Sequence, residues 1–168
     1  FSFLFLSCCT HLAGMVLFST RWEEVGIFYG TYVRPLDEKN RLQVPSKLLN
    51  ALPKKFYVLR GFEGCLDVYL EDDFTRLVDD LSSLSYRDPK SRAYVRLTLA
   101  SVSELEVDSH GRISLCKGLI DAYHIGKDVT LIGALDHFEI WDSSAYEKYE
   151  SENASSYEAL AENLQKGE

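Results

Sequence analysis

Apolar and polar residues alternate along this chain in short runs that are separated by stretches with helical spacing. Short runs rich in aromatic and β-branched residues predict strands. Leu77, Val78 and Leu81 recur at the spacing of one helical face, and Asp88-Pro89 predicts the start of a second helix. The predicted strands cover residues 27–33, 42–44, 56–60, 65–69, 103–107, 112–115, 129–132 and 138–141.

Three further helices are expected from local signals. Pro45 favours the first turn of a helix over residues 46–52, and a matching helix is expected near 119–123. Asp142 and the serines after it predict the cap of a helix that runs to residue 149. In the helix that opens at Asp88-Pro89, one apolar set is expected to lie on a buried face: Tyr94, Val95, Leu97 and Leu99.

A nine-residue pattern occurs twice, at residues 36–44 and 107–115. Each copy has an apolar residue, then Asp, three residues and Arg, and then an apolar-polar-apolar strand start. Asp37-Glu38-Lys39-Asn40-Arg41 of the first copy corresponds to Asp108-Ser109-His110-Gly111-Arg112 of the second, a step of 71 residues. The match continues at a step of 72, since Gly61 pairs with Gly133 and Tyr69 with Trp141. Two unrelated strand-turn-strand units with similar turns would be the alternative. Because two copies are too few for a solenoid, the repeat predicts one α+β domain with pseudo-two-fold symmetry.

Both copies are expected to turn in the same way. Asn40 tolerates a left-handed backbone, and Gly111 stands at the matching position, where a positive φ has no steric cost. Lys39 adds a cation beside Arg41, whereas His110 is a weaker cation at neutral pH. Cys116 stands where the first copy has Pro45, so the second short helix is expected to start less firmly.

Composition limits the function classes. The chain has 168 residues and a net charge of −8, so it is not basic as a whole and any contact with nucleic acid must come from a local patch. Acidic residues concentrate between 71 and 80 and again after 147, while 87–96 is the most basic stretch. The hydrophobic content of 46% is that of an ordinary globular domain.

Cysteine and histidine patterns argue against metal and catalytic sites. The cysteines show no CxxC spacing, which fits a reduced, cytoplasmic setting, and Cys65 and Cys116 are interpreted as buried thiols. The histidines show no ligand spacing, and the chain has neither a phosphate-binding loop nor a nucleophile elbow. We therefore expect no catalytic residues, no metal and no cofactor. Glu104 and Glu106 are expected to face solvent.

Residues 1–26 are expected to lie outside the fold as an extension. Their apolar run has no positive start for a secretory signal and is too short for a membrane span, so no membrane partner is expected. The remaining divisions predicted are a first repeat with a helical pair (27–102), a second repeat (103–150) and an acidic tail or helix (151–168).

The repeated Asp-x-x-x-Arg turn has two possible roles. Each aspartate can accept backbone N–H bonds and pair with its arginine, and this pairing alone could be purely structural. Alternatively, two equivalent arginines form a symmetric cationic pair suited to guanine edges and phosphates. The candidate DNA-binding residues are Lys39, Arg41 and Arg112, with turn support from Asp37, Asn40, Asp108 and Gly111.

The two Asp-x-x-x-Arg motifs, the string 60–66 (RGFEGCL) and the string 138–142 (FEIWD) together resemble the MraZ family of transcriptional regulators. The resemblance covers about residues 27–149, and Ile27 falls where the family usually starts with Met. It implies an AbrB-like swapped-hairpin β-barrel with helices packed outside. It also implies a ring of subunits in the nucleoid that binds direct repeats in double-stranded promoter DNA of the division and cell-wall gene cluster.

Two other function classes stay open from the sequence. The chain could be a structural oligomeric interaction module whose motif arginines serve subunit or turn ion pairs. An enzyme is the third class, and the missing catalytic motifs disfavour it. Substitution of Arg41 separates the DNA-binding regulator from the interaction module, since it would change DNA binding in the first case and assembly in the second.

Overall fold

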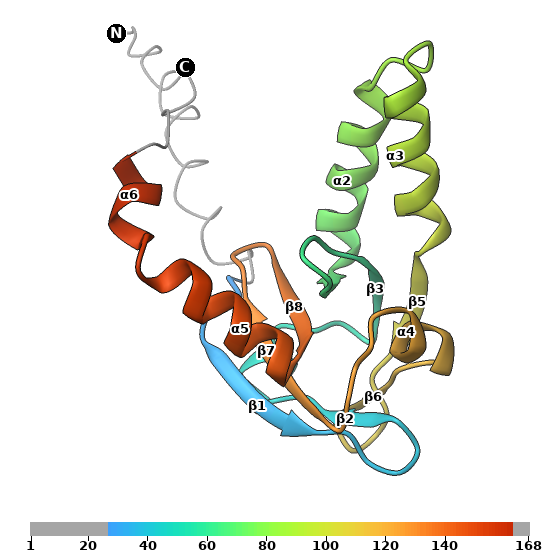
Figure 1. The fold of residues 1–168 in the computed structure, drawn as a ribbon. Helices are drawn as coiled ribbons and strands as arrows, with labels where there is room; N and C mark the ends of the chain where they lie inside the picture. The colour runs from blue at the N-terminus through green and yellow to red at the C-terminus, as the bar shows by residue number, and fades with distance from the viewer. Residues whose placement is uncertain (1–26, 163–168) are drawn as a thin grey trace, which may run out of the picture.

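The computed structural model describes residues 27–162 of the chain (Figure 1). The predicted extension, 1–26, and the end of the predicted tail, 163–168, lie outside the described residues. Among residues 27–162, no helix combines the length and the apolar character that crossing a bilayer requires.

The elements follow one another in two similar series. The first series is β1 (Thr31–Pro35), β2 (Arg41–Gln43), α1 (Ser46–Leu49), β3 (Lys55–Arg60), β4 (Leu66–Tyr69), α2 (Glu71–Ser83) and α3 (Pro89–Ala100). The second series is β5 (Ser103–Glu106), β6 (Arg112–Ser114), α4 (Lys117–Ala122), β7 (Asp128–Gly133), β8 (His137–Asp142), α5 (Ser143–Ala154) and α6 (Tyr157–Glu162). The predicted α+β class is confirmed, and α6 follows α5 in the second series as α3 follows α2 in the first.

Strands from the two repeats are interleaved. A six-stranded antiparallel sheet has the order β1-β7-β8-β4-β3-β5, and β2 pairs with β6 in a separate two-stranded ribbon. The first strand of each repeat therefore pairs with the third strand of the other, since β1 lies against β7 and β5 against β3. β4 pairs with its equivalent β8. Among the described residues these ladders do not close into a ring, because β1 and β5 are the edges of the sheet.

The core lies between the sheet and the ribbon. Leu42 of β2 and Ile113 of β6 are fully buried, and they are Cα partners in the ribbon. Because side chains alternate along a strand, their inward direction turns the neighbouring residues of the ribbon outward. The sheet contributes one apolar face to the same core: Phe56, Val58, Leu66, Val68, Val129, Leu131, Phe138 and Ile140.

The predicted helix over 46–52 is shorter in the structure. It ends at Leu49, a turn follows at residues 50 and 51, and Leu52 stands directly before Pro53. A proline disfavours the α conformation of the residue before it, which explains the early end. The reverse occurs in the second repeat, where α4 is longer than α1. The extended backbone of Cys116 leads into α4 as that of Pro45 leads into α1, and the expectation of a weaker start at Cys116 stays a prediction.

Two burial predictions were also wrong. Cys116 is exposed because it stands at the junction between β6 and α4, whereas Cys65 is buried as expected. The apolar face predicted for α3 is mostly in solvent, with Leu97 59% exposed and Leu99 43% exposed. Figure 1 shows the reason, since α2 and α3 project from the sheet as a hairpin and leave much of α3 without a covering layer.

Candidate nucleic-acid interface

The β2–β6 ribbon carries both repeated arginines on its outward face. Arg41 is the Cα partner of Ser114, and Gln43 is the partner of Arg112. These residues alternate with the buried Leu42 and Ile113, so all four lie on the opposite, outward face of the ribbon. The two guanidinium groups are therefore placed diagonally across one small two-stranded surface.

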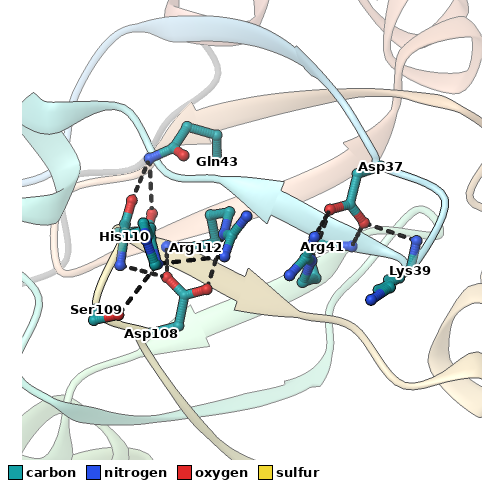
Figure 2. Close-up of polar contacts among 9 residues, drawn as sticks. Asp37, Lys39, Arg41, Gln43, Asp108, Ser109, His110 and Arg112 are labelled. Carbon is teal, nitrogen blue, oxygen red and sulfur yellow. Dashed lines mark hydrogen bonds and ion pairs between the residues drawn. The ribbon is translucent and has the colours of Figure 1, made fainter.

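The first turn is held by the carboxylate of Asp37 (Figure 2). Its Oδ1 accepts hydrogen bonds from the backbone N–H of Lys39 at 2.8 Å and from that of Arg41 at 2.9 Å. Its Oδ2 lies 2.7 Å from both Nε and Nη2 of Arg41. Asn40 adopts φ 57°, the left-handed conformation that the turn sequence predicts. The carboxylate thus fixes the turn and the direction of the arginine together.

The second turn repeats this geometry with small differences. Asp108 Oδ1 accepts from the backbone N–H groups of His110 at 2.8 Å and Arg112 at 3.0 Å, and Oδ2 accepts from Arg112 Nε at 2.8 Å. Gly111 has φ 74° at the position that matches Asn40. The His110 ring lies beside its arginine, with Nδ1 3.4 Å from Arg112 Nη2. Lys39 in the first turn is bonded through its backbone and leaves an exposed ammonium group.

The two turns are connected to each other through the ribbon. The N–H of Val44 donates to the carbonyl of Gly111 at 3.1 Å, and the N–H of Leu115 donates to the carbonyl of Asn40 at 3.0 Å. Each left-handed residue therefore accepts a bond from the end of the other repeat's strand. The two motif turns are therefore parts of one hydrogen-bonded unit.

The electrostatics keep both aspartates ionised. Hydrogen bonding to the Arg41 backbone N–H is the main cause that lowers the pKa of Asp37, although partial desolvation opposes it. Desolvation also acts to raise the pKa of Asp108. Hydrogen bonds from Arg112 and His110 outweigh it and lower that pKa to about 2. Both ion pairs therefore persist at neutral pH.

The sequence analysis missed one member of this surface. The Gln43 side-chain amide donates to the carbonyls of His110 and Gly111, each at 3.1 Å, and so connects the first strand to the second turn (Figure 2). Ser114 occupies the equivalent position and makes no such bond among the described residues. The alternation of Gln43 with Leu42 in the sequence could have placed Gln43 on the same face as the arginines. Its bonds to the second turn could not be predicted in this way, because they depend on the pairing of β2 with β6.

The most basic stretch of the sequence lies elsewhere. Arg87 and Lys90 are at the tip of the α2–α3 hairpin, which Figure 1 shows at the end of the molecule opposite the β2–β6 turns. The acidic residues at the start of α2 also lie on the sheet side away from those turns. The motif surface is thus separate from both regions, and its charges are balanced, since each arginine is paired with its aspartate and Lys39 follows Glu38.

Comparison with known proteins connects this surface to a family. The sequence profile described as "MraZ protein, putative antitoxin-like" matches residues 27–97 and matches again over residues 99–167. Each match contains one Asp-x-x-x-Arg turn. The chain belongs to the MraZ family. The two matches divide this MraZ chain into two repeats, with strands β1 to β4 in the first and β5 to β8 in the second.

Individual relatives agree over most of their length. The chain is 36% identical to the transcriptional regulator MraZ of Mesoplasma florum over 142 residues, which cover 84% of this chain and 97% of the relative. It is 36% identical to the protein of the same name from Acetivibrio thermocellus, covering 82% and 96% of the two chains. It is 37% identical to the protein of the same name from Rhodococcus jostii, over 78% of this chain and 92% of the relative.

Proposed function

We propose that this chain is a sequence-specific transcriptional regulator that binds double-stranded DNA through the β2–β6 ribbon. One observation carries the proposal: Arg41 and Arg112 stand on the same outward face, each oriented by its own aspartate. The relatives named above are called transcriptional regulators. Membership of the MraZ family also argues for a regulator and against an enzyme.

The ribbon has the chemistry that DNA recognition requires. A two-stranded β-ribbon can enter the major groove, where arginine donates two hydrogen bonds to the O6 and N7 atoms of guanine. The Asp37 and Asp108 pairs hold the guanidinium groups in place before binding, so less side-chain entropy is lost on contact. Lys39 supplies an exposed cation for a phosphate, and His110 takes that place in the second turn.

We assign the molecule to the AbrB-like swapped-hairpin barrels, and the exchange of β1 and β5 between the repeats supports this. β2 contacts β1 and β6 contacts β5, so the ribbon covers the space between the two sheet edges. In such a barrel, the β2–β6 ribbon closes the gap between the edge strands β1 and β5.

Assembly into a ring is the second part of the proposed mechanism. A single ribbon offers few phosphate contacts, so one subunit should bind weakly and in a salt-sensitive way. Several subunits on spaced direct repeats gain affinity through effective concentration. The exposed apolar side chains of α3 and of the β3–β4 turn supply a surface for subunit contact: Phe62, Tyr94, Leu97 and Leu99.

The proposed target and location follow from the family. The regulator acts in the cytoplasm, associated with the nucleoid, on promoter direct repeats of the division and cell-wall gene cluster. The runner-up function is an oligomeric interaction module in which both arginines serve only their own turns, and the ion pairs at 2.7 and 2.8 Å favour it.

A gel shift with the promoter region upstream of the chain's own gene tests the proposal. The wild type should form discrete complexes, and the double variant Arg41→Ala/Arg112→Ala should not. Arg87→Ala is the matched control, because this exposed arginine lies between α2 and α3, away from the ribbon and outside the set of residues proposed for subunit contact. Sedimentation of the same variants separates the two functions. A double variant that keeps DNA binding but changes its oligomeric state would favour the interaction module.

A further inference from the structure

The central strands carry a polar cluster that the DNA-binding proposal does not use. Asp67 of β4 and Glu139 of β8 are Cα partners, and they occupy equivalent positions in the two repeats at the step of 72. Cys65 lies two residues before Asp67 and donates from Sγ to Asp67 Oδ1 at 3.3 Å. One ligand atom from each of these three residues lies within 4.8 Å of the others.

The cluster is buried without a strong cationic partner. Cys65 is 1% exposed, Asp67 is 7% exposed and Glu139 is half-buried. In the part of the chain that the structure describes, no lysine or arginine pairs with either carboxylate. The buried carboxylate of Asp67 and the buried thiol of Cys65 are costly when ionised, so a proton or a nearby cation stabilises each of them. Burial accordingly raises the pKa of Asp67 and of Cys65.

A histidine continues the cluster along β8. His137 is the repeat counterpart of Cys65, and its Nε2 lies 3.9 Å from Glu139 Oε1. Its Nδ1 is 2.7 Å from Asp136 Oδ1, and its ring stacks on Tyr69. A carboxylate on one ring nitrogen orients the other nitrogen toward a ligand, which is the usual outer arrangement around a metal-bound histidine.

Backbone and aromatic groups hold the ligand atoms in place. The β3–β4 turn closes on the sulfur, since a Cβ at Gly61 would lie 2.3 Å from Cys65 Sγ and 2.2 Å from Asp67 Oδ1. Trp141 Nε1 donates to Glu139 Oε2 at 2.7 Å, which fixes this carboxylate and leaves Oε1 toward the histidine. Thiol and first carboxylate are thus enclosed by backbone, and the half-buried Glu139 gives access from solvent.

We propose that Cys65, Asp67 and Glu139 bind a divalent transition-metal ion of the zinc type, with His137 as the next available donor. Sulfur, carboxylate oxygen and imidazole nitrogen are the donors that Zn²⁺ and Co²⁺ take in proteins. The ion replaces the protons that otherwise neutralise the cluster, so binding strengthens as pH rises. Because one ligand strand comes from each repeat, the ion joins the two halves of the molecule across the β4–β8 ladder.

Cobalt(II) titration tests this site. The full chain is prepared with Cys8, Cys9 and Cys116 replaced by Ser, so that Cys65 is its only thiol. We expect one Co²⁺ per chain, with a sulfur-to-cobalt charge-transfer absorption, and a thermal midpoint that rises on addition of Zn²⁺. Glu139→Gln should weaken binding at least tenfold, and Cys65→Ala should remove the absorption band.

Two results would overturn the proposal. One is the absence of a sulfur-to-cobalt band in the chain whose only thiol is Cys65. The other is a band whose affinity is unchanged in both Asp67→Asn and Glu139→Gln, since the carboxylates would then not be ligands. Should Cys65→Ala fail to fold, the two carboxylate variants still decide. Arg41 and Arg112 lie outside this site, so either result is independent of DNA binding.

Discussion

The carbonyl oxygen of Asn40 accepts a hydrogen bond from the backbone N–H of Leu115 at 3.0 Å, which ties the first motif turn to the end of the second motif strand. The reciprocal bond joins Val44 to Gly111. The arginines of the two repeats therefore belong to a single hydrogen-bonded unit. A change in the backbone conformation of either turn should therefore alter the conformation of the other.

Substitution of Asn40 tests this coupling. Asn40→Val should destabilise the fold by about 1–2 kcal/mol, because a β-branched residue is strained at φ 57°. Asn40→Gly should stay within about 1 kcal/mol of the wild type, since glycine adopts this conformation freely. Urea unfolding measures both, and amide shifts of Leu115 should move in the valine variant. Equal stability of the two variants would mean that the left-handed turn is not required.

A pair of glycine substitutions tests the packing of β7. A Cβ at Gly133 would lie 2.1 Å from the backbone nitrogen of Tyr29, and backbone cannot move aside as a side chain can. Gly133→Ala should therefore destabilise by at least about 1–3 kcal/mol. Gly118→Ala is the matched control, since nothing lies within 4 Å of its Cβ and alanine favours helix. In thermal melts, the midpoint temperature should fall for Gly133→Ala and should stay level or rise for Gly118→Ala.

Acid should loosen the motif turns in a defined range. The pKa of Asp108 falls from the ordinary value of 3.8 to about 2 in the folded chain. Because the folded pKa is the lower one, its contribution to stability is present above 3.8 and is lost as pH falls toward about 2. Asp108→Asn should be less stable at neutral pH and show a shallower decline in that range. Parallel declines of the two proteins would contradict this.

The two turns should differ in their salt dependence. Lys39→Ala should reduce the slope of log affinity against log salt by about 1, because it removes one phosphate contact. His110→Lys should raise the slope by a similar amount, because it gives the second turn the cation of the first. Anisotropy titrations at several salt concentrations measure both. Unchanged slopes in both variants would place the phosphate contacts elsewhere.

Much of this fold could be predicted from the sequence because its signals are local. Strand alternation, the Asp88 cap and the left-handed turns depend on neighbouring residues, and they are confirmed by the structure. The failures depend on distant neighbours. Leu97 and Leu99 have the spacing of a buried face, but no element within residues 27–162 covers them. The link from Gln43 to His110 arises from strand exchange between residues far apart in the chain.

The central claim is that Arg41 and Arg112 bind DNA. Fluorescence anisotropy with a labelled promoter fragment, at one fixed salt concentration, tests it most directly. Each single alanine variant should lose about 1–3 kcal/mol of binding free energy, with the fold intact by circular dichroism, while Arg87→Ala should bind as the wild type does. Wild-type affinity in a well-folded Arg41→Ala/Arg112→Ala variant would contradict the account.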